Sequence, residues 1–397
     1  MSSTLQNDKG ISSHLLWIIT LTTGLSIANL YYCQPLLGLI QHEFNISELL
    51  TNTISIVSQA GYALGLLFII PLGDMLKRRN IILANFGLLV FSLLVIAFSP
   101  NIYVLLVASF ITGVCAVTPQ LFLPLVSQFS TPETKNTNVG IVVSGLLTGI
   151  LASRVVSGFI GELYGWRTMY IIAALIMVAC FLVLYSQFPF VLPNFTGKYS
   201  KLMKSVLAIA REEPKLRFAA TKSGLAFGSF LSLWAMLAFK MAEPPFYAGG
   251  TVVGLLGLCG ASGAVAASII GKYVSRIGLY RINFMGTLLI FAAWVNLYVF
   301  QNFYTGIILG IIVLDVGMQC IQLGNQTVVL TLRPSAVNRV NTVFMTTYFV
   351  GGALGTTLTG FAWSLWRWEG VVLVGLILIT FSFVINLYQY LTNKELK

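Results

Sequence analysis

The sequence predicts an all-α integral membrane protein, and three observations lead to this fold class. Of the 397 residues, 57% are hydrophobic and only 9% are charged, whereas soluble domains carry about 25% charged residues. The mean hydropathy is +0.87. The apolar residues form runs long enough to cross a bilayer, which takes about 20 residues in a helix. This composition excludes a soluble enzyme, a nucleic-acid-binding protein and a disordered chain.

We predict twelve transmembrane helices, because lipid offers no hydrogen-bond partners to open backbone and no run alternates as a barrel strand does. The first run follows a polar start without the basic region of a cleaved signal, so we expect it to be retained. In order, the runs are 14–39, 48–72, 80–99, 102–127, 138–161, 167–187, 217–241, 249–271, 281–300, 303–330, 341–363 and 370–391.

The longest interval between runs divides them into six plus six. We therefore predict an N-terminal six-helix bundle at 1–187, a basic cytoplasmic linker at 188–216 and a C-terminal six-helix bundle at 217–397. The linker segment SKLMKSVLAIAREE fits either a short amphipathic helix on the inner leaflet or a solvated connection.

The net charge of +11 reflects orientation. Nineteen of the 23 Lys and Arg residues lie in the N-terminal segment, the linker, the C-terminal segment and the loops on that same side. Since short cationic loops stay in the cytoplasm, we predict that both termini are cytoplasmic. The expected location is the inner (plasma) membrane of a bacterium.

The two predicted halves contain a weak internal repeat. The loop GDMLKRRN (73–80) after span two aligns with GKYVSRIG (271–278) after span eight, which pairs Arg78 with Arg276. The end of span five, GFIGELYGW (158–166), aligns with the end of span eleven, GFAWSLWRW (360–368), and this pairs Gly149 with Gly351. Repeats of this kind are typical of secondary transporters built from related halves.

With these features, nearly the whole chain resembles the major facilitator superfamily. The most specific match is the loop between spans two and three, where Asp74, Arg78 and Arg79 fit the family pattern. Ile70, Met75 and Lys77 depart from it. The resemblance implies that this loop is a conformational latch on the inner face, joined through the repeat by Arg276. Simple topogenic positive charge is the alternative.

Two longer strings narrow the resemblance. ANLYYCQPLL (28–37) and NTVFMTTYFVGGALG (341–355) look like a bacterial group of efflux permeases, and glycine-rich span five looks like that of the family's antiporters. Ser109 stands where the family's drug–proton exchangers carry an arginine. The resemblance implies proton-coupled efflux of small organic molecules by alternating access, with import as the alternative. The chain has no phosphate-binding GxxxxGK[ST] loop, so ATP-driven pumping is not expected.

Two ionisable residues lie well inside predicted spans: Arg154 in span five and Asp315 in span ten. Each costs about 2.5–3.5 kcal/mol to insert, so each is expected to face a cavity or a partner. Asp315 is the candidate proton carrier, with a structural polar contact as the alternative. We expect Arg154 to bind an anionic substrate group or to pair with Asp315 in one state; an ion pair that holds a closed state is equally compatible.

Polar side chains along span ten share one helix face with Asp315. Gln319, Gln322 and Gln326 follow it at i+4, i+7 and i+11, and Asn325 lies beside them. A helix–helix hydrogen-bond seam would explain the same stripe. The resemblance places spans one, four, seven and ten around a central cavity. Span one has a weaker polar stripe that includes Asn29, with Tyr32 and Gln34 near Pro35. The further candidates for the substrate and proton pathway are these three residues, Gln120 in span four and Trp234 in span seven, for which simple packing is the alternative.

Other residue patterns argue against chemistry at a cofactor or metal. The two histidines lie near span ends and the five cysteines form no CxxC motif, so we expect no metal, no cofactor, no disulfide and no intramembrane enzyme. A passive channel is disfavoured by the two repeated halves. The expected partners are a neutral or amphiphilic small molecule, protons and the lipid bilayer, with no nucleic acid, and the protein is expected to be a monomer.

Two packing expectations complete the prediction. Lys240 and Glu243 stand at i and i+3 near the outer end of span seven, where a surface ion pair is expected. The Gly145–Gly149 pair forms a GxxxG motif, which predicts that span five packs closely against a helix of the other half.

Overall fold

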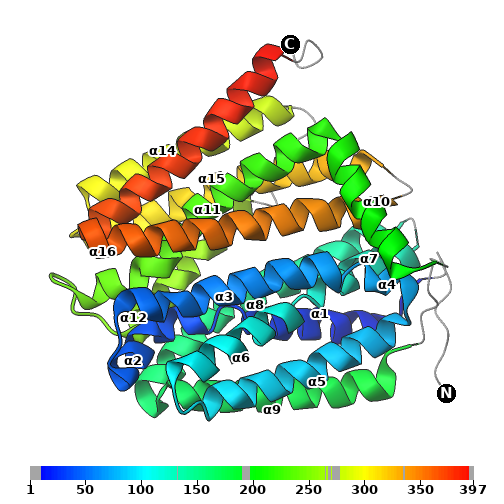
Figure 1. The fold of residues 1–397 in the computed structure, drawn as a ribbon, viewed down its shortest axis with the longest axis horizontal. Helices are drawn as coiled ribbons and strands as arrows, with labels where there is room; N and C mark the ends of the chain where they lie inside the picture. The colour runs from blue at the N-terminus through cyan, green and yellow to red at the C-terminus, as the bar shows by residue number, and fades with distance from the viewer. Residues whose placement is uncertain are drawn as a thin grey trace.

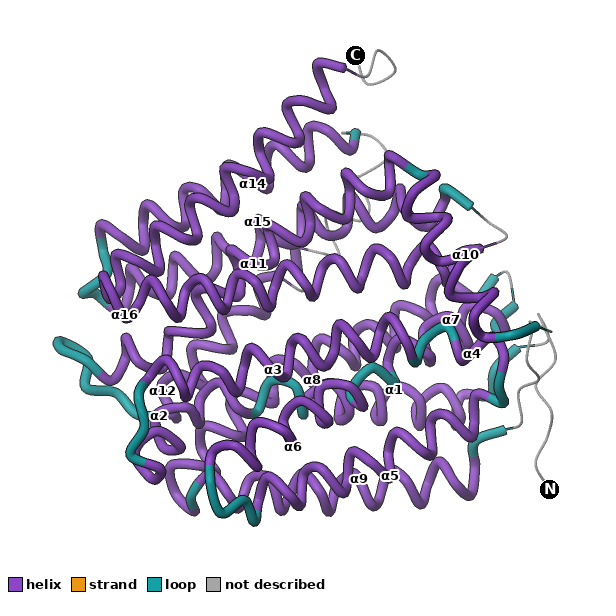
Figure 2. The backbone as a smooth tube through the Cα atoms, viewed as in Figure 1, coloured by secondary structure: helices purple, strands orange, loops and turns teal. Residues whose placement is uncertain are grey.

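A computed structural model shows a bundle of long helices (Figure 1). It describes residues 10–131, 133–189, 197–263, 265–266, 270, 278–333 and 336–392. Across these ranges every regular element is helical (Figure 2). Ten of the helices are long and apolar enough to cross a membrane. The predicted all-α membrane fold is confirmed.

The first half contains nine helices. They are α1 (Ser13–Ala28), α2 (Cys33–Phe44), α3 (Glu48–Phe68), α4 (Leu72–Met75), α5 (Arg78–Ala97), α6 (Ile102–Cys115), α7 (Pro119–Phe129), α8 (Lys135–Tyr164) and α9 (Trp166–Gln187). The pair α1–α2 forms predicted span one, and the pair α6–α7 forms predicted span four.

The linker and second half follow as α10 (Tyr199–Glu212), α11 (Pro214–Ala242), α12 (Gly250–Leu256), η1 (Gly257–Gly260), α14 (Leu279–Val299), α15 (Tyr304–Thr331) and α16 (Val337–Thr392). The 56-residue α16 bends at Trp366–Arg367 and contains predicted spans eleven and twelve. Predicted span eight begins as α12 and η1, and part of it lies outside the described residues. The number twelve therefore stays a prediction.

Breaks in spans one and four open the backbone at mid-depth. Between α1 and α2, Asn29 donates from Nδ2 to the carbonyls of Leu25 and Ser26, which caps the end of α1. Pro119 begins α7, and Pro35 lies in the first turn of α2; neither has a backbone N–H to extend the preceding helix. Because non-helical backbone at this depth is tolerated only inside protein or at a cavity, both breaks point to the centre of the bundle.

Close glycine contacts confirm the repeat. A methyl group at Gly149 in α8 would lie 2.1 Å from the carbonyl oxygen of Gly24 in α1, and one at Gly351 in α16 would lie 2.2 Å from that of Gly224 in α11. Gly149 and Gly351, which the repeat aligns, therefore each allow two helices of their own half to approach backbone to backbone. The Gly145–Gly149 motif packs on α1 within its own half. The expected close contact of span five with the other half is made instead at Gly158, where an added Cβ would lie 2.3 Å from the carbonyl oxygen of Gly250 in α12.

We expect Gly351→Ala to destabilise the protein by about 1–3 kcal/mol, since the backbones of α11 and α16 must separate to admit a methyl group. Thermal unfolding of the purified protein in detergent measures this loss. Gly87→Ala is the matched control, because nothing lies within 4 Å of its added Cβ. An equal fall in melting temperature for both variants would contradict this packing.

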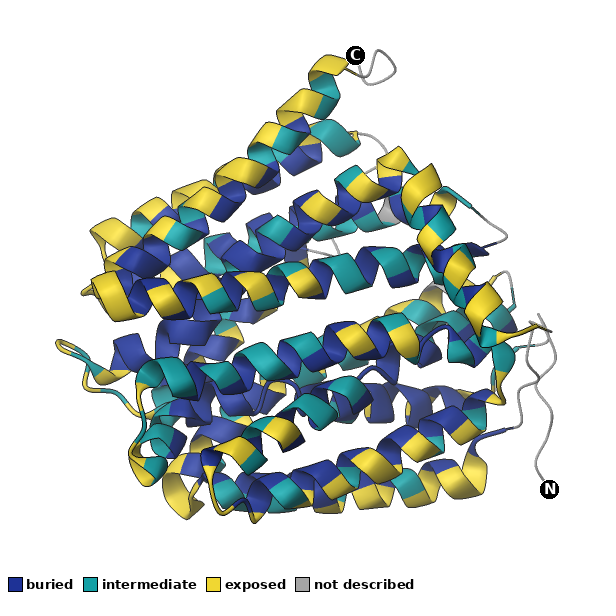
Figure 3. Ribbon diagram, viewed as in Figure 1, coloured by how far each residue is buried: buried dark blue, intermediate teal, exposed yellow. Residues whose placement is uncertain are grey.

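The linker forms the helix that one of the two alternatives predicted. In α10, Leu202, Val206 and Ile209 are buried against the bundle (Figure 3). Arg333 pairs with Glu212 at 3.0 Å and with Glu213 at 2.6 Å, which anchors the end of the helix. The apolar face of α10 thus covers the protein itself and is not free to lie in the leaflet.

Candidate functional site

Two cavities lie at opposite ends of the bundle. The first, of about 630 Å³, reaches from Gln120 and Gln326 to Asp74, Lys135 and Arg339 at the α4–α10 end. The second, of about 790 Å³, lies at the end formed by α2, α12 and the bend of α16 (Figure 1). If the charge-based orientation is correct, the first faces the cytoplasm.

Arg154 lies between the two cavities and is 2% exposed. Its Nε donates to Oε1 of Gln34 at 2.9 Å. The guanidinium carbon lies 3.7 Å from the ring centroid of Trp234 and 5.3 Å from that of Tyr31. The charge is thus held on two aromatic faces, a contact worth more in a desolvated site than at a surface. Three predicted pathway residues, Arg154, Gln34 and Trp234, come together here.

Asp315 of α15 faces the same space and is 6% exposed. No ion pair within 4.0 Å joins it to Arg154. The two side chains approach each other across Gly260, where an added Cβ would lie 3.5 Å from Oδ1 of Asp315 and 3.9 Å from Nη1 of Arg154. The predicted pair therefore shares one buried space without direct pairing in this conformation.

Buried polar atoms remain unsatisfied around this space. Oδ2 of Asp315 has no hydrogen-bond donor, and Nε1 of Trp234 has no acceptor, within the described part of the chain. Unpaired polar groups in a dry interior cost about 1–3 kcal/mol each. A carboxylate, a guanidinium and an indole N–H that lack full partners can bind a polar group of a ligand or exchange a proton.

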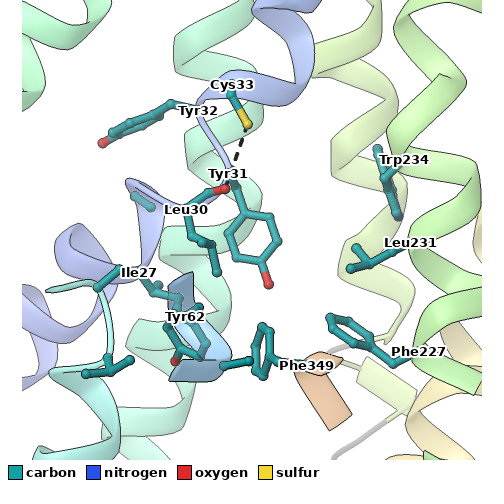
Figure 4. Packing of buried hydrophobic residues seen from close by; sticks show 14 of the residues in the cluster. Ile27, Leu30, Tyr31, Tyr32, Cys33, Tyr62, Phe227, Leu231, Trp234 and Phe349 are labelled. Carbon is teal, nitrogen blue, oxygen red and sulfur yellow. Dashed lines mark hydrogen bonds between the residues drawn. The ribbon is translucent and has the colours of Figure 1, made fainter. Parts of the chain in front are cut away.

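An aromatic layer separates the centre from the first cavity. Tyr62 and Phe349 have ring centroids 4.2 Å apart, and Phe227 stacks on Tyr348 at 3.9 Å. In Figure 4 the Tyr31 ring points toward Phe349, and Leu231 lies between Phe227 and Trp234. Because α3 supplies Tyr62 while α11 and α16 supply the others, the layer joins the two halves.

The polar residues along α15 have different neighbours. Oε1 of Gln322 accepts from the Tyr348 hydroxyl at 3.0 Å. Gln326 lines the first cavity together with Gln120 of α7. Gln319 lies beside Gly263, next to Asp315. Asn325 instead exchanges amide hydrogen bonds with Asn283 of α14, at 2.7 Å and 3.4 Å. Its placement matches the alternative of a helix–helix seam.

The span-one candidates also separate. Gln34 meets Arg154, whereas Nδ2 of Asn29 faces Met177 of α9 within its own half, 3.4 Å from the sulfur. Tyr32 points away from Trp234 in Figure 4, and its neighbour Tyr31 is the residue that contacts Arg154. Adjacent residues in the break face different directions, which helical spacing cannot foresee.

Three of the four predicted latch residues, Asp74, Arg78 and Arg79, lie at the α4–α10 end. Asp74 lies 3.9 Å from Nη2 of Arg78 and accepts from Nδ2 of Asn338 in α16 at 3.0 Å, which ties the two halves together. Arg79 contacts the carbonyl and the ring of Tyr185 within the first half. Arg276, the fourth predicted latch residue, lies outside the described residues.

A second tie between the halves lies at the opposite end. Arg367 pairs with Glu48 of α3 at 2.6 Å and also with Glu243. Nε1 of Trp363 donates to the same carboxylate of Glu48 at 2.6 Å. The expected Lys240–Glu243 ion pair is wrong: Lys240 is buried and donates to Gln301 instead, while Glu243 binds Arg367.

Arg367 holds its tie at the cost of backbone strain. Its φ is 48°, and the aligned Gly165 of the first half has φ 83°. A non-glycine residue in this region costs of order 1–3 kcal/mol and persists where its surroundings hold it. Here two carboxylates and the Trp363 ring, 4.6 Å from the guanidinium, do so.

We expect Arg367→Gly to keep the bend but open this end of the bundle. Glycine accepts the positive φ, while the loss of an exposed ion-pair network worth about 1 kcal/mol shifts the conformational equilibrium about fivefold. The rate of maleimide labelling of Ala238→Cys, which lines the second cavity, measures the shift in purified protein. Arg367→Lys, which keeps the charge, is the control. Equal labelling in all three backgrounds would refute a gating role.

Comparison with known proteins agrees with this architecture. The sequence profile of the Major Facilitator Superfamily matches residues 16–356. The uncharacterized transporter YgaY of Escherichia coli O157:H7 is 34% identical over 365 residues, which cover 92% of this chain and 93% of the relative. The uncharacterized MFS-type transporter YceJ of Bacillus subtilis is 23% identical over 386 residues, covering 91% and 92%.

The fold is also found in a solved structure. The crystal structure of a bacterial homolog to the human lysosomal transporter Spinster, in an inward-facing and unoccupied conformation, superposes with a TM-score of 0.77. The match covers 96% of each chain at 13% sequence identity, so it concerns the fold alone. From the profile match and the relatives, the chain belongs to the major facilitator superfamily and is a multi-pass membrane transporter.

Proposed function

We propose that the protein is a proton-coupled secondary transporter that moves small organic molecules by alternating access, with efflux as its direction. One observation carries this proposal: Asp315 is a buried carboxylate with an unpaired oxygen, placed beside Arg154 between cavities at the two ends of the bundle. A carboxylate in such a position can take a proton from one side and release it to the other. We place the protein in a bacterial inner membrane as a monomer without a cofactor.

The contacts between the two halves, one at each end of the bundle, can open in turn and so produce alternating access. Rocking of the halves about the centre would break the Asp74–Asn338 contact at one end and the Glu48–Arg367 pair at the other in turn. The site around Arg154 then faces one cavity at a time. This geometry suits coupled transport better than a channel, since neither cavity is lined by Arg154 or Asp315.

Import of a solute together with a proton is the second candidate. The position of Arg154 favours import, because its permanent positive charge beside Asp315 repels a cationic solute and attracts an anionic one. Exchange of solute for protons, which the resemblance to antiporters implies, requires instead that the two compete for one site.

Growth of an efflux-deficient bacterial strain that expresses the protein, on a panel of toxic organic solutes, tests the proposal. Efflux predicts raised tolerance to a subset of solutes, and import predicts raised sensitivity. Uptake of the responding solute into everted vesicles is then expected to fall when a protonophore dissipates the gradient. Downhill flux that no protonophore alters would contradict coupled transport. Cells that express Asp315→Asn are the control.

A further inference from the structure

We propose that the central site binds the carboxylate of an organic acid, with Arg154 and Trp234 as its donors and Gly260 as the residue that keeps the binding space open. This assignment rests on the proposed proton-coupled transport and names the class of solute that it carries. Because proton and solute would occupy the site together, it supports the second candidate above, import of solute with a proton, against the efflux by exchange that we proposed first.

Two neighbouring donor groups at the site lack acceptors. Gln34 accepts from Nε of Arg154 and so fixes the plane of the guanidinium, whose Nη atoms have no acceptor among the described residues. Trp234 is 1% exposed, and its Nε1 has no partner. A planar guanidinium matches the two oxygens of a carboxylate. A carboxylate ligand would satisfy donors that the protein leaves unpaired, as buried polar groups require.

Asp315 lies where it competes for the same guanidinium. Its Oδ1 lies 3.5 Å, and Nη1 of Arg154 lies 3.9 Å, from the position that a Cβ of Gly260 would fill. In the described part of the chain, the other titratable side chains near the Asp315 carboxyl are Cys259 of η1 and Tyr348 of α16, and neither is a cation. Arg154 is therefore the cation that Asp315 can neutralise within the described residues. Protonation of Asp315 removes this competitor and leaves Arg154 to the ligand.

With Asp315 protonated, the charge of Arg154 is neutralised only if the bound solute carries a negative charge, as an ionised organic acid does. With Asp315 protonated, Arg154 and a bound carboxylate together are neutral, so the loaded site can close without an unpaired charge, which would be costly in a dry interior. A cationic solute would face Arg154 at close range. The rings of Tyr31 and Trp234 lie against the guanidinium, and Leu231 and Phe227 follow Trp234 along α11 (Figure 4), so this side of the site fits an apolar body on the solute.

Matched probe pairs test the charge of the ligand. We expect benzoate, phenylacetate or 4-phenylbutyrate to raise the melting temperature of the purified protein, and benzylamine, phenethylamine and 4-phenylbutylamine not to do so. The carboxylate effect should be larger at mildly acid than at mildly alkaline pH, because protonated Asp315 no longer competes. Protection by the amines, or by no carboxylate of the series, overturns the assignment.

Variants separate binding from folding. Asp315→Asn mimics the protonated acid, so carboxylate binding is expected to tighten and to lose its pH dependence. Gly260→Ala and Arg154→Lys are each expected to weaken binding at least about tenfold, since one fills the space and the other loses the bidentate donors. Gly87→Ala, whose Cβ meets nothing within 4 Å, is the control. Loss of carboxylate binding in Asp315→Asn would overturn the assignment, because competition would then be absent.

The outcomes distinguish this assignment from the proposed function. Carboxylate binding without any proton-dependent flux would uphold the site and refute the coupling. Proton-dependent flux of an amine, with no carboxylate binding, would uphold the coupling and refute the substrate class.

Discussion

Replacement of Asp315 by Asn is expected to abolish solute accumulation driven by a pH gradient in proteoliposomes. Asparagine keeps the size and polarity of the side chain but cannot carry a proton, so the solute can still bind and cross without being coupled. We expect accumulation to fall to the equilibrium level while exchange of labelled for unlabelled solute continues. Parallel measurement of both fluxes separates lost coupling from lost folding.

Asp74→Asn is the matched control for this experiment. Asp74 is a carboxylate at the α4–α10 end, where it accepts from Asn338 and lies near Arg78. Its neutralisation is expected to change the rate of transport through the latch and to leave the accumulation ratio intact. Undiminished accumulation in Asp315→Asn would assign the proton to another group.

Replacement of Arg154 by Ala is expected to reduce transport at least about thirtyfold. Truncation of one member of a buried charged set costs about 2–5 kcal/mol, and each 1.4 kcal/mol is about tenfold. The change also removes the partner of Gln34 and leaves the Trp234 face uncovered. Initial rates of solute uptake into proteoliposomes, normalised to correctly folded protein, measure the effect.

Two milder variants, Arg154→Lys and Gln34→Ala, are expected to lose less transport than Arg154→Ala. Lysine keeps the positive charge without the planar fork, so transport is expected to recover in part. Gln34→Ala removes only the hydrogen bond to Nε and is expected to cost about tenfold or less. Transport at the wild-type rate in Arg154→Ala would exclude the residue from the solute pathway.

The sequence was sufficient to single out the two charges, because Arg154 and Asp315 interrupt apolar runs that have no other reason to contain them. It could not place them together. Their approach depends on η1, where Gly257 and Gly260 have no side chains to separate α8 from α15. Glycines in a transmembrane run usually indicate close helix packing, so nothing in the sequence marked Gly257 and Gly260 as the place where the two charges meet.

The direction of side chains near the helix breaks was also beyond prediction. Tyr32 was the predicted tyrosine in this span, but the turn between α1 and α2 aims Tyr31 at Arg154. In contrast, Gln34 follows the turn on the regular helix α2, and it does meet Arg154. Patterns based on 100° per residue hold only along an unbroken helix.

The partner of Glu243 could not be predicted from the sequence, for a different reason. Local spacing favoured a pair between Lys240 and Glu243, but Glu243 binds an arginine 124 positions away. That contact requires the bend in α16, which places Arg367 at a positive φ where the aligned residue of the first half is a glycine. The sequence alignment of the two halves contained this difference, although its meaning depended on the backbone.

Charge movement after a pH jump tests the central role of Asp315 most directly, and it needs no knowledge of the solute. Proteoliposomes adsorbed on a sensor surface are shifted from mildly alkaline to mildly acid pH. We predict a transient current as protons bind in the wild type and in Asp74→Asn, and none above protein-free liposomes in Asp315→Asn. An undiminished current in Asp315→Asn would contradict the assignment of the coupled proton to this carboxylate.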